Sequence, residues 1–368
     1  MLHLAATPYT LRFRTPAATS RGALTTREIW FMRVWDNGAA EISGWGETGA
    51  LPGLSRDDCS DFAAQMAHFC AAFNRRGYST PAEALPAVAG ISAALPSLAF
   101  GVETALLDLA GGGQQRLWDT SFTRGEAGLP THGLIWMDTP DGIMRQVEAK
   151  VAAGFDVIKM KIGALPFDAE LALLRHIRNS FPAIELRLDA NGALAPSEAL
   201  QQLEALAALD IAFVEQPVHS GQWEVMAAIC RRSPIEIALD EELISITSDE
   251  QRSALLTTVR PHLLILKPAL LGGFSACRAW IADAQECGVR WLANSLLESN
   301  VGLNAICQWA SVCGSDTVHG LGSGTLFTNN IDSPVRLRGT RLELDASRAW
   351  DFRFQGSVSP TLPQTPAP

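Results

Sequence analysis

The sequence of 368 residues contains no long hydrophobic run, although hydrophobic residues make up 47% of it. No apolar stretch reaches the roughly 20 residues that a membrane-spanning helix needs, so we expect no membrane segment. The first residues, Met1–Pro8, lack the basic flank and the apolar stretch of a signal peptide. The hydrophobic content is still ample for a large buried core, which excludes a mostly disordered chain.

Cysteine and histidine patterns typical of metal or disulfide sites are also missing. The seven cysteines form no Cys-x-x-Cys pair and are odd in number, and the seven histidines show no ligand spacing. We therefore expect buried free thiols in a reducing compartment, which indicates a cytoplasmic protein. An excess of positive charge is absent too, because the net charge is −10. This argues against nucleic-acid binding and means that an anionic substrate must be attracted locally.

Two lysines one residue apart, Lys159 and Lys161, are the most informative feature that is present. They lie in a strand-like run, and a strand places residues i and i+2 on one face. In a buried setting, two neighbouring ammonium groups repel each other and both lose hydration. A structural strand has no use for this arrangement, whereas a site that removes a weakly acidic proton and stabilises the resulting anion does. The alternative is an exposed edge strand, where such pairs are common.

Three further strand-like runs end in a carboxylate, and a fourth ends in a lysine. Asp189, Glu215, Asp240 and Lys267 follow one another at intervals of 26, 25 and 27 residues, and Lys161 precedes Asp189 by 28. Such an interval corresponds to about one strand, one helix and two short loops. A carboxylate that ends a strand is often the N-cap of the next helix. That alternative does not account for three carboxylates and three lysines in register on five successive strands.

The alternation of apolar strands and helical patterns predicts an α/β fold, a (β/α)8 (TIM-type) barrel with an α+β capping domain. Such alternation favours a parallel sheet with helices outside. The charged residues lie at the C-terminal ends of their strands, where barrel active sites form. The eight strands are expected near residues 132–137, 157–162, 184–189, 212–216, 235–240, 263–267, 290–294 and 318–321.

The chain is longer than one barrel, so about a hundred residues must lie elsewhere. A hairpin signal at 36–38, followed by helical patterns, predicts an α+β capping domain over residues 1–128. We expect the barrel over residues 129–330 and a C-terminal segment, 331–368, that returns to the capping domain. The last ten residues contain four prolines and are expected to fray.

Three carboxylates at one end of a barrel repel one another unless a cation lies between them. An all-oxygen cage open to water suits Mg²⁺ better than zinc, with Mn²⁺ as an alternative. With this pattern the chain resembles the enolase superfamily, in its muconate-lactonizing-enzyme subgroup. The resemblance covers nearly the whole chain and implies that Asp189, Glu215 and Asp240 bind Mg²⁺. It also implies that Lys161 and Lys267 flank the substrate from opposite faces.

Within this subgroup, four segments are similar to the o-succinylbenzoate synthase family. The similarity implies a Mg²⁺-dependent syn dehydration of a dicarboxylate, 2-succinyl-6-hydroxy-2,4-cyclohexadiene-1-carboxylate. The product would be 2-succinylbenzoate, formed through an enediolate in menaquinone biosynthesis. The four segments are residues 238–243, 266–274, 295–304 and 320–330.

The resemblance also implies a role for each catalytic lysine. Lys161 would remove the α-proton and then protonate the leaving hydroxyl group. Lys159 would add positive charge near the enediolate, and Lys267 would hold the ring through a cation–π contact. The segment 19–22 is similar to the mobile loop that this family closes over its substrate. The predicted substrate-binding residues are Ser20, Arg21, Asn191, Ser295, Gly322 and Ser323.

Three alternatives remain open. A dipeptide epimerase or an N-succinylamino acid racemase would share every metal-binding and lysine residue. Dipeptide epimerases commonly carry Asp-x-Asp at the eighth strand, where this chain has residues 322–324, Gly-Ser-Gly, so the racemase is the stronger rival. Glycines at this place also bind phosphate in many barrels, which leaves the carboxylates unexplained. A barrel that only binds a ligand is disfavoured. Loss of catalysis usually shows as a replaced base or metal ligand, and the three carboxylates and three lysines are all present.

Overall fold

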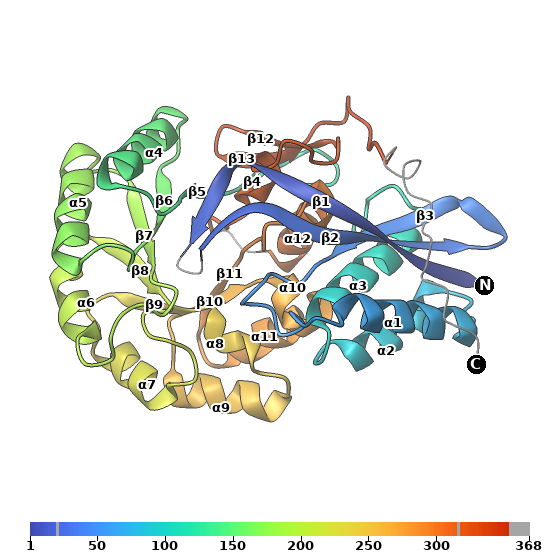
Figure 1. The fold of residues 1–368 in the computed structure, drawn as a ribbon, viewed down its shortest axis with the longest axis horizontal. Coiled ribbons are helices and arrows are strands. Elements are labelled where there is room, and N and C mark those ends of the chain that lie inside the picture. The colour runs from blue at the N-terminus through green and yellow to red at the C-terminus, as the bar shows by residue number, and fades with distance from the viewer. Residues whose placement is uncertain (20–21, 315–316, 353–368) are drawn as a thin grey trace.

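The computed structural model describes residues 1–19, 22–314 and 317–352. An antiparallel sheet with its own helices lies beside a parallel sheet that is surrounded by helices (Figure 1). The predicted loop residues Ser20 and Arg21 and the tail expected to fray lie outside the described residues. Within the described ranges, no helix combines the length and the apolar character needed to cross a membrane.

A three-stranded antiparallel sheet, in the order β1-β2-β3, and three helices form the first part of the chain. The predicted hairpin at 36–38 is confirmed, because β2 and β3 pair on either side of it. Helix α3 packs closely on the sheet, since a Cβ atom at Gly44 of β3 would lie 2.0 Å from the carbonyl oxygen of Ala105. The bounds are β1 Leu2–Thr19, β2 Gly22–Asp36, β3 Ala39–Thr48, α1 Phe62–Arg76, α2 Pro81–Ile91 and α3 Pro96–Ala110.

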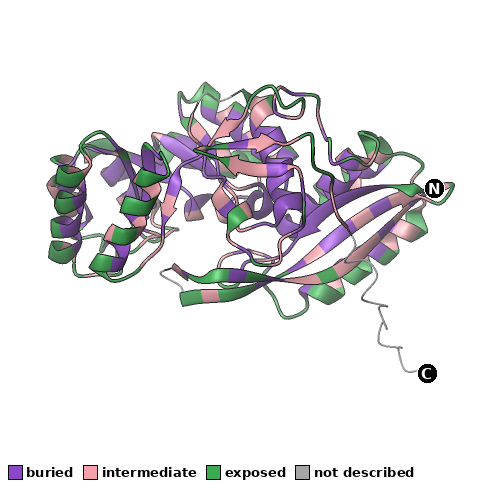
Figure 2. Ribbon diagram, turned by 90° about the horizontal axis from the view of Figure 1, so that it is seen from above, coloured by how far each residue is buried: buried purple, intermediate pink, exposed green. Residues whose placement is uncertain are grey.

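Seven parallel strands follow, and each pairs with the next along the chain. Ile158 and Met160 face the surrounding helices and are buried, while Lys159 faces the other way, as the strand period predicts. Figure 2 shows these buried strands between helices whose outer faces are exposed. The strands are β5 Gly133–Ile135, β6 Val157–Lys161, β7 Glu185–Asp189, β8 Ile211–Glu215, β9 Glu236–Leu239, β10 Leu263–Leu266 and β11 Arg290–Ala293. The helices are α4 Pro140–Ala152, α5 Phe167–Ser180, α6 Ala199–Ala207, α7 Trp223–Arg232, α8 Glu241–Ile244, α9 Asp249–Val259, α10 Pro268–Leu271, α11 Phe274–Glu286 and α12 Asn300–Cys313.

The predicted eighth strand is not a regular strand, and the prediction was wrong in this respect. It forms two isolated parallel bridges, which join Thr131 to His319 and Asn294 to Gly320. These bridges connect the first and the last strand of the sheet. The segment is short because the chain enters a 3₁₀ helix, η1 (Gly322–Thr325), two residues later.

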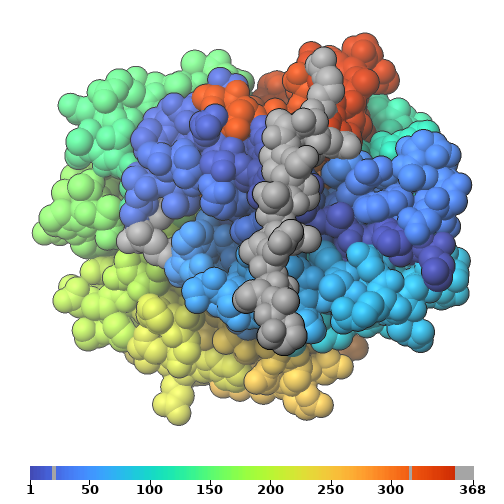
Figure 3. Space-filling model, turned by 45° about the vertical axis from the view of Figure 1, so that its right-hand side comes forward, coloured from blue at the N-terminus to red at the C-terminus, as the bar shows by residue number. Residues whose placement is uncertain are grey.

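The described chain after α12 contacts both the antiparallel sheet and the parallel-sheet part. Phe352 stacks on Trp45 of β3 with ring centroids 4.9 Å apart. Near η1, Phe327 forms a bridge with Phe13 of β1, and Figure 3 shows the blue N-terminal strands lying against orange residues of this later segment. A small antiparallel sheet has the order β12-β13-β4, with β12 Val335–Arg338, β13 Arg341–Leu344 and β4 Leu129–Pro130.

All seven cysteines lie in the described part of the chain, and none of them forms a disulfide. Four of them are buried, as expected. Cys59 and Cys287 are exposed, so the expectation of buried thiols does not hold for these two residues.

A buried carboxylate joins the antiparallel sheet to the start of α12. Glu47 of β3 accepts hydrogen bonds from the backbone nitrogens of Ser299, at 2.9 and 3.0 Å, and of Gly302, at 3.1 Å. It also accepts one from the hydroxyl of Ser299 at 2.5 Å. These are donors that the first turn of a helix leaves unpaired. Glu47 thereby fixes α12, and the loop before it, to the antiparallel sheet.

Replacing Glu47 by alanine should lower the free energy of unfolding by about 2–4 kcal/mol, because several buried donors lose a charged acceptor. Glu41→Ala is a matched control on the same strand, at an exposed position. We expect this control to change stability by no more than about 0.5 kcal/mol. Urea denaturation measures both variants, and equal losses would contradict a linking role for Glu47.

A second buried carboxyl near this junction should make stability depend on pH. Burial raises the pKa of Glu298 to about 7, and the nearby Arg27 only partly opposes this shift. The folded state then binds more protons than the unfolded state, so this group's contribution to stability falls as pH rises from about 4.5 to about 7. The fall should amount to roughly 3 kcal/mol.

Glu298→Gln should remove this fall in stability with rising pH. Relative to the wild type, the variant should gain stability between pH 4.5 and 8, while the two proteins should be equally stable below pH 4.5. Urea denaturation of both proteins across this range measures the difference, and a difference that is independent of pH would contradict the raised pKa of Glu298.

Candidate active site

The C-terminal ends of five neighbouring strands bring the predicted lysines and carboxylates together. Lys161 of β6 pairs in register with Asp189 of β7, which in turn pairs with Glu215 of β8. Asp240 and Lys267 follow directly after β9 and β10. Because parallel strands align their carboxyl ends at one edge, the five residues share one end of the sheet.

Direct ion pairs connect the lysine pair to two of the carboxylates. Lys159 Nζ lies 3.1 Å from Oδ2 of Asp189 and 2.5 Å from Oε2 of Glu215. Lys161 Nζ lies 3.1 Å from the same Asp189 oxygen. Lys159 is only 4% exposed and Glu215 is fully buried. The exposed-edge alternative for the lysine pair is therefore wrong.

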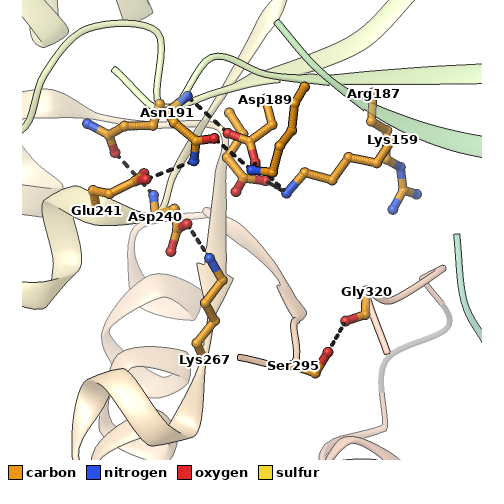
Figure 4. Close-up of polar contacts among 12 residues, drawn as sticks. Lys159, Arg187, Asp189, Asn191, Asp240, Glu241, Lys267, Ser295 and Gly320 are labelled. Carbon is orange, nitrogen blue, oxygen red and sulfur yellow. Dashed lines mark hydrogen bonds and ion pairs between the residues drawn. The ribbon is translucent and has the colours of Figure 1, made fainter. Parts of the chain in front are cut away.

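Asp240 forms a separate ion pair with Lys267, and Figure 4 shows the two side chains pointing toward each other. Asp240 precedes α8, but its side chain makes no capping hydrogen bond within the described chain. The N-cap alternative thus fails for Asp240. Its carboxylate pairs with Lys267 instead.

The charges in the cluster shift one another's pKa values. Burial raises the pKa of Glu215 to about 8, and the neighbouring Asp189 carboxylate adds to this effect while Lys159 opposes it. Burial on its own would lower the pKa of Lys159 and raise that of Asp189. Their mutual attraction reverses both effects, so that the pKa of Lys159 is raised and that of Asp189 is lowered. Lys159 and Asp189 thus hold each other in the charged form.

As the side chains stand, no group of three or more His, Cys, Asp or Glu residues in the described ranges is arranged to hold a metal ion. Asp240 is paired with Lys267 instead of lying with the other two carboxylates. Two observations nevertheless fit a divalent cation. Oε1 of Glu215 is buried without a described hydrogen-bond partner, and Asp189 and Glu215 already direct one oxygen each at a single cationic nitrogen. Carboxylate oxygens are the ligands that Mg²⁺ prefers.

Asn191 holds Lys161 in place, a role that the sequence analysis did not assign to it. Its Oδ1 accepts a hydrogen bond from Lys161 Nζ at 2.6 Å, and its Nδ2 donates to Glu241 at 2.9 Å. Asn191 has a φ of +44°, a left-handed conformation that asparagine tolerates better than most residues. The only signal for this role in the sequence is the position two residues after Asp189.

The cluster opens into a cavity of about 1010 Å³, part of which is open to solvent. All four lysines of the chain line this cavity. The predicted substrate-binding residues that are described also line it, namely Asn191, Ser295, Gly322 and Ser323. Several lining residues were not predicted, because they come from separate segments of the chain and form no motif. They include Leu51 and Leu54 of the N-terminal part and Thr131, His132, Leu134, Trp136 and Asn294 of the parallel-sheet part.

Comparisons with known proteins identify the family of the chain. A family model described as "Enolase C-terminal domain-like" matches residues 142–347. The chain belongs to the enolase superfamily. An o-succinylbenzoate synthase from Desulfotalea psychrophila is 42% identical over 354 residues, which cover 89% of this chain and 95% of that protein. The resemblance of the sequence to the enolase superfamily is therefore confirmed.

Solved structures from the superfamily have the same fold. The crystal structure of MenC from Desulfotalea psychrophila LSv54 matches with a TM-score of 0.80 and 38% identity, over 93% of this chain and 99% of that one. A dipeptide epimerase from Enterococcus faecalis V583, complexed with Mg and the dipeptide L-Leu-L-Tyr, matches with a TM-score of 0.82 over 95% of this chain and 97% of that one. The epimerase is only 20% identical, so this second match concerns the fold alone.

Proposed function

We propose that this chain is an o-succinylbenzoate synthase. It dehydrates 2-succinyl-6-hydroxy-2,4-cyclohexadiene-1-carboxylate to 2-succinylbenzoate, a step of menaquinone biosynthesis. The observation that carries the proposal is the buried array of Lys159, Lys161, Asp189 and Glu215, in a chain that is 42% identical to a synthase of this name over 89% of its length.

Asp189, Glu215 and Asp240 would hold a divalent cation, Mg²⁺ or alternatively Mn²⁺. When bound, this cation stabilises the negative charge that develops on the substrate carboxylate as the α-proton leaves. Lys159 adds positive charge beside these carboxylates, since its ammonium group already contacts two of them.

Lys161 carries the proton in both halves of the reaction. Its neutral amine removes the α-proton, and the resulting ammonium returns that proton to the hydroxyl group as the C–O bond breaks and water leaves. Removal and return of the proton by one residue give a syn elimination. Asn191 contributes by holding the Lys161 nitrogen at 2.6 Å.

Lys267 faces the substrate ring from the side opposite to Lys161 in this proposal. A desolvated cation–π contact of this kind stabilises the bound ring by about 2 kcal/mol. The side chain of Lys267 is only 12% exposed, which supports this role.

The enzyme pairs a capping domain over residues 1–128 with a parallel β/α barrel over residues 129–330, whose eighth strand is reduced to two bridges, and the described residues after 330 return to the cap. The protein acts in the cytoplasm on a small dicarboxylate, and the seven cysteines without a disulfide are in keeping with a reducing compartment.

A panel of substrates separates the synthase from its rivals. With Mg²⁺ present, we would compare kcat/KM for dehydration of the cyclohexadiene with that for solvent-deuterium exchange at the α-carbon of an N-succinylamino acid and of L-Ala-L-Glu. Dehydration should have the highest kcat/KM by at least about tenfold. Faster exchange with the N-succinylamino acid would assign a racemase and overturn the proposal.

A further inference from the structure

Three polar side-chain atoms in one wall of the cavity have no hydrogen-bond partner among the described residues. They are Nδ1 of His132, Oδ1 of Asn294 and Oγ of Ser323. These residues are 6%, 6% and 2% exposed, respectively. Buried polar atoms are nearly always paired, so three unpaired atoms on residues that line one cavity point to a partner that a ligand supplies.

Gly320 brings this wall together. A Cβ atom at Gly320 would lie 2.0 Å from Oδ1 of Asn294 and 2.9 Å from Cε1 of His132, so both side chains lie directly against its backbone. His132 precedes β5, Asn294 follows β11, and Ser323 lies in η1. Figure 4 shows Gly320 set apart from the Asp240–Lys267 pair, on another side of the site. At Gly320 the wall therefore borders a part of the cavity away from Asp240 and Lys267.

The wall is also uncharged. Burial lowers the pKa of His132 well below its usual value, and the charges of Lys159 and Arg187 lower it further. The imidazole is thus neutral near pH 7, and Asn294 and Ser323 carry no charge. A carboxylate favours a cationic or strongly charge-assisted partner, whereas neutral donors suit an uncharged carbonyl oxygen.

We infer that His132, Asn294 and Ser323 form a subsite for the ketone oxygen of the substrate's succinyl side chain. This inference rests on the proposed function, which supplies a substrate with a ring carboxylate and a side-chain ketone. Each residue has a donor to offer: the imidazole with its proton on Nδ1, the hydroxyl of Ser323, and the NH₂ group of Asn294 after a half-turn of its amide. The subsite fixes the side chain while the carboxylate cluster fixes the ring.

Equilibrium binding of three benzoates to the Mg²⁺-loaded enzyme tests the subsite without the need for turnover. The ligands are 2-succinylbenzoate, its deoxo analogue 2-(3-carboxypropyl)benzoate, and 2-butanoylbenzoate, which keeps the ketone but lacks the distal carboxylate. The variants are Asn294→Leu and Ser323→Ala. Thr328→Ala is the control, because its hydroxyl is exposed and lies outside the cavity.

Each subsite variant should weaken binding of the two ketones by about tenfold, while binding of the deoxo analogue should change less than about twofold. The control should bind all three ligands like the wild type. Equal losses for ketone and deoxo ligands would overturn the inference, and so would losses seen only with ligands that carry the distal carboxylate. In both cases the wild type still binds 2-succinylbenzoate and the proposed function stands. A wild type that binds none of the three would overturn the proposed function and the subsite with it.

Discussion

Lys161→Ala should reduce kcat for dehydration by about 10²–10⁴-fold, the range that a positioned general base contributes. The loss follows from the geometry, because the Lys161 ammonium is held between Asp189 and Asn191 at the mouth of the carboxylate cluster. Single-turnover assays with saturating Mg²⁺ measure the effect.

Lys161→Arg separates proton transfer from charge. A guanidinium group keeps the positive charge beside Asp189, but it does not lose its proton under working conditions. Both variants should therefore lose activity to a similar extent, and both should still be stabilised by Mg²⁺ in thermal melts. Near-normal dehydration by Lys161→Ala would contradict the role of Lys161 as the base.

Asp240→Asn should weaken Mg²⁺ binding by at least about 100-fold and abolish activity at millimolar Mg²⁺. Loss of a residue that only supports a metal ligand typically costs 10–100-fold in affinity, so the loss of a ligand should cost at least about as much. The amide keeps the shape of the side chain but removes the negative charge that also pairs with Lys267. Calorimetric titration with Mg²⁺ measures the affinity directly.

Glu236→Gln is the matched control for Asp240→Asn. Glu236 begins β9, at the opposite end of the strand from Asp240, and it is exposed. This variant should bind Mg²⁺ like the wild type. Asp240→Asn with wild-type affinity for Mg²⁺ would remove Asp240 from the proposed metal site.

The charged cluster was predictable because each part of it has a local signal. The strand period places Lys159 and Lys161 on one face, and a spacing of 25 to 28 residues repeats the strand–helix unit that aligns the carboxylates. The lysine content is a further signal. The chain has four lysines among 29 basic residues, and all four line the cavity. Arginine can supply positive charge at the surface, but of these two basic residues only lysine readily gives up its proton.

Other features depend on contacts between distant segments, and no local pattern reports them. The eighth strand was expected from an apolar run, yet its pairing is limited to two bridges before the chain turns at Gly322. The pairing of Asp240 with Lys267, apart from the other carboxylates, depends on side-chain orientation. His132 and Asn294 both lie against the backbone of Gly320, from a third segment, at a place where a side chain would clash with them.

The most direct measurement is the conversion of 2-succinyl-6-hydroxy-2,4-cyclohexadiene-1-carboxylate by the purified protein, with Mg²⁺ and with excess chelator. We predict rapid formation of 2-succinylbenzoate with Mg²⁺, none with chelator, and recovery when Mg²⁺ is restored. Formation of 2-succinylbenzoate at the same rate in chelator would contradict the metal site, and no formation with Mg²⁺ would contradict the proposed reaction.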